Sequence, residues 1–235
     1  MKNNRYNLPR PEFSSELVSI LKREVDRQNI ELDKLTIKQK RQFQEVNEEI
    51  LEKSIPHRYV LKKLPSKLGS GIFLHPSEKA MQKGEVIASY SGSVSIAPQN
   101  LEDEGGSYVF SPLDKILLTR EEQKKYDRKN QYHPKRYYYL KIDASKKGNF
   151  TRYINHSEQP NVVACLSHIK DNYGKETVCE VIYMCKNKIL PGEQLLVSYE
   201  DGEESYWKAM GFSPKLVLPD TFKLNSKLEL ISTTS

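Results

Sequence analysis

The segment GNFTRYINHSEQPN, residues 148 to 161, carries the side chains of this chain that are best suited to bind a ligand. Its Arg, Asn, His, Ser, Glu and Gln residues surround Phe150, Tyr153 and Ile154, as if half of the segment were buried. Buried Asn and His side chains need hydrogen-bond partners. The partner is either the backbone of the fold itself or a bound ligand, and the segment alone does not decide between them.

Two further motifs suit a binding site. Gly69-Ser70-Gly71 precedes an apolar run, and two glycines one residue apart allow a close approach of the backbone to a ligand. A tight turn without any ligand explains the same residues, and the spacing is not the dinucleotide-binding fingerprint. In LPGEQLLVSY, residues 190–199, a Pro-Gly turn enters a short strand that ends at Tyr199. Taken alone, Tyr199 is more typical of a half-buried strand residue than of a catalyst.

Composition narrows the class of protein. A chain of 235 residues with 37% apolar content can bury one sizeable core, so we expect one domain with an additional arm. The net charge of +6 comes from charges of both signs spread along the chain, which does not predict direct binding of nucleic acid. The first residues lack an apolar signal region, and no run approaches the roughly 18 apolar residues of a membrane span. We therefore expect a soluble protein that is not exported by a cleaved signal.

The pattern of apolar residues changes near Pro56. Before it, apolar residues recur at helical spacing and predict two amphipathic helices, with Thr36 and Gln39 as a capping box for the second. After it, runs rich in Val, Ile and Tyr predict a mainly β domain of several small sheets. The expected strands cover residues 58–64, 71–74, 85–90, 107–110, 136–143, 161–169, 176–185 and 194–197.

Three connecting segments complete this scheme. Residues 111–135 are polar and predict one exposed helix inserted between strands. DNYG at 171–174 predicts a hairpin turn between two strands. The tail after Pro219 has little apolar content, so we expect it to be loosely held. We divide the chain into a helical arm (1–55), a catalytic or binding domain (56–212, with an insertion at about 93–136) and a C-terminal tail (213–235).

Together, the motifs resemble those of the SET-domain family of protein lysine methyltransferases. The resemblance runs from the glycines near residue 70 through KGEVIASYSG and IDASKKGNFTRYINHSEQPN to PGEQLLVSYEDG, about residues 60 to 212. The compact layout, Glu158 after the Ser, and Tyr206-Trp207-Lys208 look most like short bacterial SET proteins of the chlamydial type. The resemblance implies a pseudoknot-like crossing of the Asn-His segment and the Tyr199 strand, a topology that is rare in other folds.

The resemblance also implies the cofactor, S-adenosylmethionine, and the residues around it. Asn155 and His156 would line its pocket, and the backbone of the glycine motif would receive its methionine end. Arg152 is expected among the cofactor-binding residues and also as the residue that orients the crossing. Tyr153 and Ile154 are expected in the core, and Ser157 is expected to close a turn. The predicted cofactor-binding residues are Gly69, Ser70, Gly71, Arg152, Asn155, His156, Tyr199 and Trp207.

Methyl transfer to lysine explains why such a site needs tyrosines. Only about one lysine side chain in 2,500 is neutral at pH 7, which corresponds to roughly 4.6 kcal/mol. Apolar walls and a neighbouring sulfonium both lower the pKa of the lysine amine, and a narrow aromatic channel aligns it with the methyl group. The resemblance assigns the catalytic tyrosines to Tyr199 and Tyr90, with Tyr90 alternatively serving only as a wall.

Departures from the family pattern change several expectations. Many SET enzymes have a Cys after Asn-His-Ser and a later Cys cluster on a structural zinc, but this chain has Glu158 and no such cluster. We therefore expect no zinc, and we expect Cys165, Cys179 and Cys185 to be reduced core residues. Tyr206, Trp207 and the GFSPKL stretch at 211–216 would close the cofactor pocket by apolar cover, with Trp207 either at the adenine or in the core.

The number of methyl groups added is left open by the sequence. Many relatives have Phe or Tyr two residues before the last Tyr, whereas this chain has Val197. One of Tyr137, Tyr138 or Tyr139 could supply a substitute ring, since strand alternation lets only some of them face inward.

The resemblance favours a protein lysine N-methyltransferase. Its substrate would be a basic, lysine-containing protein segment, by analogy a histone or a histone-like protein, with the insertion at 111–135 as one wall of the peptide groove. The alternative is a catalytically weak SET-like module that binds peptides by strand addition. The arm would pack on the domain or on a second copy, and we favour a homodimer. We expect a cytoplasmic or nuclear location. The alternative is a bacterial effector that is secreted into a host cell and acts there as a chromatin regulator.

Overall fold

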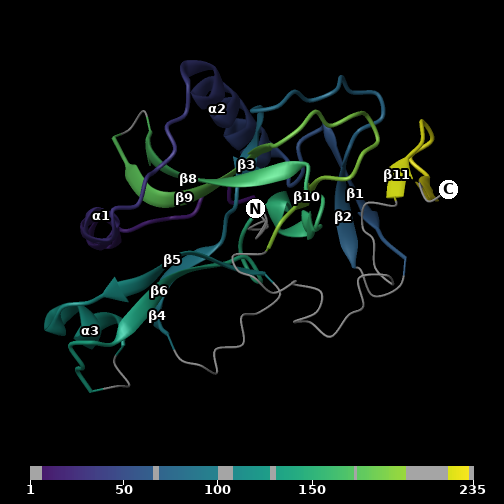
Figure 1. Ribbon diagram of the computed structural model, residues 1–235. Helices are drawn as coiled ribbons and strands as arrows, with labels where there is room; N and C mark the ends of the chain where they lie inside the picture. The colour runs from purple at the N-terminus through teal and green to yellow at the C-terminus, as the bar shows by residue number, and fades with distance from the viewer. Residues whose placement is uncertain are drawn as a thin grey trace.

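The computed structural model of the protein describes residues 7–65, 69–99, 108–127, 131–171, 174–199 and 222–232. Within them the fold is mainly β, as predicted, with small sheets and helices packed on them (Figure 1). The helices are α1 (Ser15–Gln28), α2 (Ile37–Glu52), α3 (Arg120–Tyr126) and the 3-10 helix η2 (Phe150–Tyr153). No helix in these ranges combines the length and apolar content that crossing a membrane requires.

The described strands form four sheets. The five-stranded sheet contains, in spatial order, β3 (Val86–Ser89), β9 (Glu176–Cys185), β8 (Val162–Lys170), β10 (Leu196–Val197) and β7 (Asn155–His156). The three-stranded sheet contains β4 (Ser93–Pro98), β6 (Tyr137–Asp143) and β5 (Val109–Leu117). The two-stranded sheets pair β1 (Tyr59–Lys63) with β2 (Ser70–Leu74) and β11 (Phe222–Leu224) with β12 (Leu230–Ser232). Of these strand pairs, the two that involve β10 are parallel, and the others are antiparallel.

Both predicted amphipathic helices are present, and their ends follow from local chemistry. The Ser14 hydroxyl accepts a hydrogen bond from the Leu17 N–H and so caps α1 at its N-terminus. Asn29 ends α1 in the left-handed region, with φ at 52°. At α2 the predicted capping box forms between Thr36 and Gln39.

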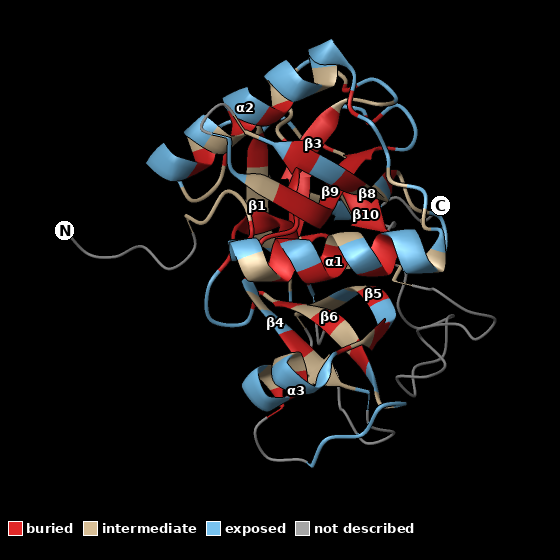
Figure 2. Cartoon of the chain, turned by 90° about the vertical axis from the view of Figure 1, so that its left-hand side faces the viewer, coloured by how far each residue is buried: buried red, intermediate tan, exposed pale blue. Residues whose placement is uncertain are grey.

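Helix α1 lies between the five-stranded and the three-stranded sheets (Figure 2). Its apolar stripe joins side chains of both sheets in one buried cluster. Leu21 is fully buried there, together with Tyr138 from β6 and Cys179 from β9. The helix therefore fixes the inserted three-stranded sheet to the rest of the domain through apolar contacts.

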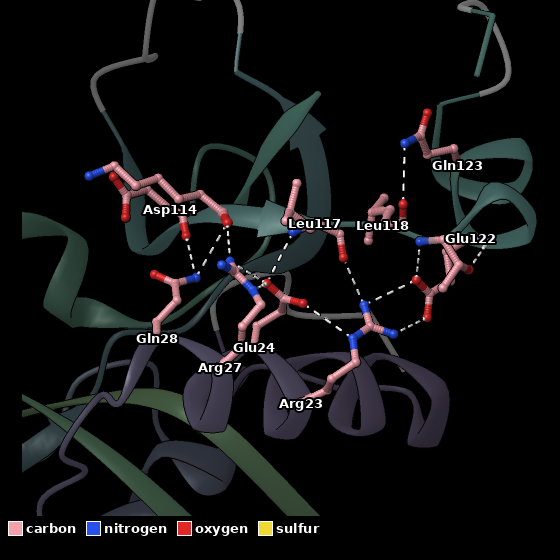
Figure 3. A network of polar contacts seen from close by, with 11 residues as sticks. Arg23, Glu24, Arg27, Gln28, Asp114, Leu117, Leu118, Glu122 and Gln123 are labelled. Atoms are coloured by element: carbon pink, nitrogen blue, oxygen red, sulfur yellow. Dashed lines mark hydrogen bonds and ion pairs between the residues drawn. The ribbon is translucent and has the colours of Figure 1, made fainter. Parts of the chain in front are cut away.

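Polar contacts reinforce the same junction (Figure 3). The Arg23 guanidinium donates to Glu122 of α3 at 2.8 Å and to the Leu117 carbonyl at 2.8 Å. The buried Glu24 carboxylate accepts from the Leu117 N–H at 3.0 Å and pairs with Arg27 at 2.7 Å. These contacts connect α1 with the end of β5 and the start of α3, so they determine how the insertion sits on the helix.

Helix α2 covers the opposite face of the five-stranded sheet. Its Phe43 packs with Val86 of β3 and with Ile182 and Met184 of β9. The apolar stripes of α1 and α2 are thus covered within one chain, which is the alternative to a second copy that the sequence left open. The homodimer through the arm stays a prediction, but it is no longer needed to cover the apolar stripes of the two helices.

The insertion contains the predicted helix, α3, and more strand than the sequence indicated. Strand β4 was not predicted, and β5 continues to Leu117 although the expected strand ended at residue 110. The pairing of β5 with β6 shifts twice, and Lys115 has a φ of 50°. These bulges break the alternation of apolar and polar residues, and this explains why the sequence pattern suggested a polar segment here.

The expectation of a loosely held tail is wrong for residues 222–232. They form the β11–β12 hairpin, and Leu224 is buried against Phe73 of β2. Gly192 of the Pro-Gly turn has a φ of 82°. Its N–H donates to the Leu74 carbonyl, and its carbonyl accepts from the Leu224 N–H. A Cβ at Gly192 would lie 2.3 Å from the Leu224 carbonyl oxygen, so only glycine fits. Leu224 is the buried residue of this hairpin, and the composition of the tail does not reveal its contact.

Candidate active site

The segments that carry the Asn-His and Tyr199 motifs lie side by side. Strand β7 pairs in parallel with β10, which places Asn155 beside Leu196 and His156 beside Val197. The Tyr199 N–H donates to Nδ1 of His156 at 2.9 Å. His156 is 1% exposed, so its imidazole is buried, as predicted. This hydrogen bond shows that one partner of the imidazole is the backbone of the fold itself.

Asn161, the last residue of the motif, fixes this crossing. Its side-chain amide donates to the Gln194 carbonyl at 2.8 Å, and its side-chain oxygen accepts from the Leu196 N–H at 2.9 Å. Its backbone carbonyl accepts from the Lys186 N–H at 2.8 Å. The Pro-Asn pair was part of the sequence motif, but its role as a clamp between distant segments is visible only in the fold.

The start of the motif is anchored to β3. Asn149 caps η2 by accepting from the Thr151 N–H at 3.0 Å, and it donates to the Ser89 carbonyl at 2.9 Å. Phe150 and Ile154 are each 1% exposed. The half-buried character that the sequence suggested is therefore confirmed, and the backbone satisfies several of these polar groups.

The glycine motif meets the same site from β2. Asn155 donates from Nδ2 to the Ser70 carbonyl at 3.0 Å, which joins the two predicted cofactor-binding motifs. Gly69 has a φ of 71°, a conformation that favours glycine. A Cβ at Gly71 would lie 2.6 Å from Nε2 of the buried Gln194, so a larger residue here would require that side chain to move. All three motifs found in the sequence thus meet at one place.

Tyr199 lies at the centre of the crossing. Its hydroxyl donates to the Ile154 carbonyl at 2.6 Å, and its ring centroid is 5.5 Å from that of His156. The side chain is half-buried and packs against the main apolar cluster. The geometry fixes the position of the phenol oxygen through a buried backbone carbonyl.

Tyr90 is buried beside this group and has a different environment. Its hydroxyl donates to the Tyr108 carbonyl at 2.7 Å. Its ring lies 5.6 Å from Phe110 and 5.9 Å from Tyr183, centroid to centroid. Burial raises the pKa of Tyr90 well above its ordinary value, against the opposing effect of the Arg152 guanidinium. Tyr90 is therefore a neutral phenol at physiological pH and forms part of an aromatic wall.

Arg152 makes contacts that orient the chain. Its guanidinium donates to the Ala144 and Ser145 carbonyls and lies 4.0 Å from the centroid of the Tyr108 ring. These contacts join η2 to the end of β6 and to the insertion, which agrees with the expected orienting role. Its contact with a cofactor stays a prediction.

The substitute ring that Tyr137, Tyr138 or Tyr139 could supply stays a prediction, and two of the three lie outside the main apolar cluster. Tyr138 is fully buried, but it belongs to the cluster beneath α1, and its hydroxyl lies 2.9 Å from Asp127. Tyr137 is 46% exposed. In the main cluster the Tyr90 ring lies beside Tyr183 of β9, a residue that the sequence pattern did not single out. The signal available was the position of Tyr183 within a long apolar strand, which does not distinguish core from site.

The three cysteines lie in three different apolar clusters. Cys185 belongs to the main cluster, Cys179 to the cluster beneath α1, and Cys165 packs at the edge of the cluster around Phe43. Burial raises the pKa of Cys165 to about 11 and the pKa of Cys179 and Cys185 to about 12. Cys179 and Cys185 are buried thiols, as expected. Within the described ranges no three His, Cys, Asp or Glu side chains are close enough to hold a metal ion.

Part of the predicted site lies outside the described residues. Trp207, Tyr206 and the GFSPKL stretch all fall between residues 200 and 221. Their predicted contribution to the cofactor pocket therefore stays a prediction.

Residues 71–200 match the family model described as "SET domain". The match covers more than half of the chain and contains the crossing of β7 with β10, Tyr90 and Tyr199. This chain belongs to the SET-domain family.

Three known proteins illustrate the similarity. The histone-lysine N-methyltransferase, H3 lysine-4 specific, of Schizosaccharomyces pombe is 41% identical over 64 residues, which are 27% of this chain and 6% of that protein. The crystal structure of the methyltransferase domain of human histone-lysine N-methyltransferase SETMAR has a TM-score of 0.40 and 19% identity, covering 62% of this chain and 45% of that chain.

The third is a structure of ctPRC2 in an autoinhibited conformation bound to S-adenosylmethionine, with a TM-score of 0.40 and 20% identity. The similarity covers 73% of this chain and 19% of that chain. The chain thus spans less than half of the length of each of these three proteins.

Proposed function

We propose that the protein is an S-adenosylmethionine-dependent protein lysine N-methyltransferase. The observation that supports it most strongly is the meeting of Ser70, Asn155, His156 and Tyr199, held by the hydrogen bonds described above. Membership of the SET-domain family and the 41% identity to a histone-lysine N-methyltransferase over 64 residues support the same activity.

The residues at the crossing fit the proposed cofactor. S-adenosylmethionine combines an amino acid end, an adenine ring and a sulfonium that supplies the methyl group. The backbone at Gly69 and Ser70 can approach its amino acid end, since the conformation of Gly69 leaves no side chain in the way. Asn155, whose side chain donates to the Ser70 carbonyl, and the adjoining His156 can contact the remainder through backbone and side-chain groups.

The aromatic cluster supplies what a lysine amine needs. Its walls include Tyr90, Phe110 and Tyr183, whose rings exclude water from the end of the substrate side chain. Such walls disfavour the ammonium form, so they lower the pKa of a lysine that enters. The Tyr199 oxygen, fixed by the Ile154 carbonyl, can accept a hydrogen bond from the neutral amine and align it.

We propose the substrate only as a class of protein. A histone or histone-like basic protein suits the activity of the fission-yeast relative, and the insertion would form one wall of its groove. Glu158, in place of a zinc-binding cysteine, supports a place among short bacterial SET proteins, with the target in the bacterium or in a host cell.

Two measurements test the proposal. S-adenosylmethionine at about a hundred times its Kd should add about 2.7 kcal/mol to the free energy of unfolding, which raises the melting temperature. ATP, which shares the adenosine but lacks the methionine end, is the control ligand. Labelled methyl transfer to core histones and to bacterial basic proteins, followed by mass spectrometry, identifies the substrate and the number of methyl groups.

The outcomes separate the alternatives. A raised melting temperature with transfer to lysine supports the enzyme. Binding of a basic peptide without any transfer would favour the peptide-binding module. The absence of both S-adenosylmethionine binding and methyl transfer would contradict the proposal as a whole.

A further inference from the structure

Tyr183 lies on the face of the five-stranded sheet that forms the site. Side chains alternate along β9, so Val181, Tyr183 and Cys185 join the main apolar cluster, whereas Ile182 and Met184 face α2. The Tyr183 ring is therefore on the same side as Tyr90 and Tyr199.

Small residues flank Tyr183 on both neighbouring strands. It pairs with Ala88 of β3 and with Ala164 of β8. A tyrosine between two alanines has methyl groups at its sides, so its ring can rise above the sheet without crowding. Its centroid lies 5.9 Å from that of Tyr90, and the two rings are tilted by 52°.

The aromatic residues around Tyr183 differ in how far they are buried. Tyr199, Tyr108 and Phe110 are partly buried at the edge of the cluster, while Tyr183 is 1% exposed. Burial raises the pKa of Tyr183 far above its ordinary value, and the nearby phenols of Tyr199 and Tyr90 act in the same direction. The Tyr183 hydroxyl is therefore neutral, and its ring is the most buried of this aromatic group.

The hydroxyl groups of Tyr90, Tyr199 and Tyr183 differ in their hydrogen bonds. Tyr90 donates to the Tyr108 carbonyl and Tyr199 donates to the Ile154 carbonyl. Among the described residues no hydrogen bond is made by the Tyr183 hydroxyl, and its oxygen is not completely enclosed by protein atoms. The Tyr183 oxygen, beside two phenols whose O–H groups donate to carbonyls, is therefore open to a hydrogen-bond donor that arrives with a ligand.

We propose that the Tyr183 hydroxyl is the second hydrogen-bonding group for the amine of the substrate lysine, with Tyr199 as the first. This inference rests on the proposed methyltransferase activity and assigns Tyr90 to the wall. A neutral primary amine needs its lone pair for the methyl group and has two N–H bonds to donate. The oxygens of Tyr199 and Tyr183 accept these two bonds, which fixes the direction of the lone pair.

The kinetic test compares Tyr183→Phe with Tyr59→Phe. Tyr59 is also buried in the main cluster, and its hydroxyl contacts only the Met81 sulfur, at 3.8 Å, so it is a matched control. Tyr183→Phe should lower kcat about tenfold, the worth of one uncharged hydrogen bond, with S-adenosylmethionine affinity and melting temperature nearly unchanged. Tyr59→Phe should keep kcat within about twofold. A Tyr183→Phe enzyme with wild-type kcat would overturn the assignment.

A second measurement works on the wild-type protein and needs no substrate protein. Tyrosines labelled with ¹³C at the ring carbon that bears the hydroxyl are followed by NMR, with resonances assigned by the same Phe variants. The Tyr183 resonance should respond differently to S-adenosylmethionine and to S-adenosylhomocysteine, which lacks the methyl group and the positive charge. The Tyr59 resonance should be the same with both.

The results distinguish the two levels of the proposal. An identical Tyr183 resonance with both compounds, while Tyr199 distinguishes them, would overturn the role of Tyr183 and leave the methyltransferase proposal standing. Failure of both compounds to bind would overturn both.

Discussion

The junction beneath α1 and the crossing of β7 with β10 are held together by different chemistry. Beneath α1 the polar contacts are made mainly by charged side chains, and those of Arg23 and Arg27 are 41% and 39% exposed. At the crossing they involve amides, an imidazole and a phenol, and His156 is 1% exposed.

The difference indicates what each region does for the protein. Half-exposed ion pairs contribute little stability, so the apolar stripe of α1 supplies most of the attachment of the insertion, and the pairs select its orientation. Buried uncharged hydrogen bonds have strict geometry and are costly to leave unmade. We therefore expect the first region to respond mainly in stability and the second mainly in binding and catalysis.

The largest effect should follow Leu21→Ala in α1. Leu21 is fully buried in the cluster that joins the two sheets. Truncation of such a leucine typically costs about 2 to 5 kcal/mol of the free energy of unfolding. Chemical denaturation measures this loss, and Ile37→Ala, at a position 89% exposed, should change it by less than about 0.5 kcal/mol. Equal effects of the two substitutions would contradict the structural role of α1.

Tyr199→Phe should affect activity instead of stability. The ring that packs on the cluster is kept, while the hydroxyl that aligns the amine is lost. Loss of one such group at a reacting centre typically costs roughly 2.7 to 4 kcal/mol, or a hundredfold to a thousandfold in kcat. Tyr137→Phe, at a position 46% exposed, is the control. A Tyr199→Phe enzyme with normal cofactor affinity and wild-type turnover would show that Tyr199 is structural.

Tyr90→Phe refines the same prediction. The Tyr90 hydroxyl is committed to the Tyr108 carbonyl, and its ring is the part that faces Tyr183. Because the wall survives the substitution, the loss in kcat should be smaller than for Tyr199→Phe. A larger loss would return Tyr90 to the catalytic role that the resemblance allowed.

The sequence predicted the two regions unequally. Helices α1 and α2 were visible because their signals are local, with apolar residues at helical spacing and the Thr36–Gln39 capping box. What they pack on was not visible, since Tyr138 and Cys179 lie more than a hundred residues away along the chain. The crossing was expected only from the resemblance, because neither strand is long enough to have a pattern of its own.

The misses have the same physical cause. Tyr183 has apolar neighbours in sequence, and only the fold places its ring beside Tyr90, between Ala88 and Ala164. The β11–β12 hairpin owes its place to Leu224, which meets Phe73 from a distant strand. Contacts between residues far apart in sequence leave no periodic signal.

Replacement of His156 or Asn155 by Ala should weaken S-adenosylmethionine binding by more than about tenfold, because a buried polar contact with the ligand is lost. Calorimetry measures the affinity directly. The matched controls are the exposed His168 and Asn187, whose replacement by Ala should leave it unchanged. Unaltered affinity in both site variants would remove the cofactor assignment.

The smallest effect should come from Glu122→Gln, in the polar junction of α1 with α3. Burial raises the pKa of this half-buried carboxyl, but hydrogen bonds from Arg23 and from the Thr119 N–H outweigh it, so the pKa is lowered in the folded protein. A carboxyl with a lowered pKa stabilises the fold above its unfolded pKa of about 4.3, and loses this contribution as the pH falls through the folded value.

Glu122→Gln should therefore cost about 0.2 to 1 kcal/mol at pH 7, because solvent screens the half-exposed Arg23, and the cost should shrink toward pH 3 or in concentrated salt. Urea denaturation of both proteins at several pH values measures the difference, with Glu121→Gln as control because the Glu121 side chain is 78% exposed. A cost that is the same at acid and neutral pH would mean that the ion pair contributes nothing. The polar junction would then act through shape alone, and the orientation of the insertion would depend on the apolar stripe of α1.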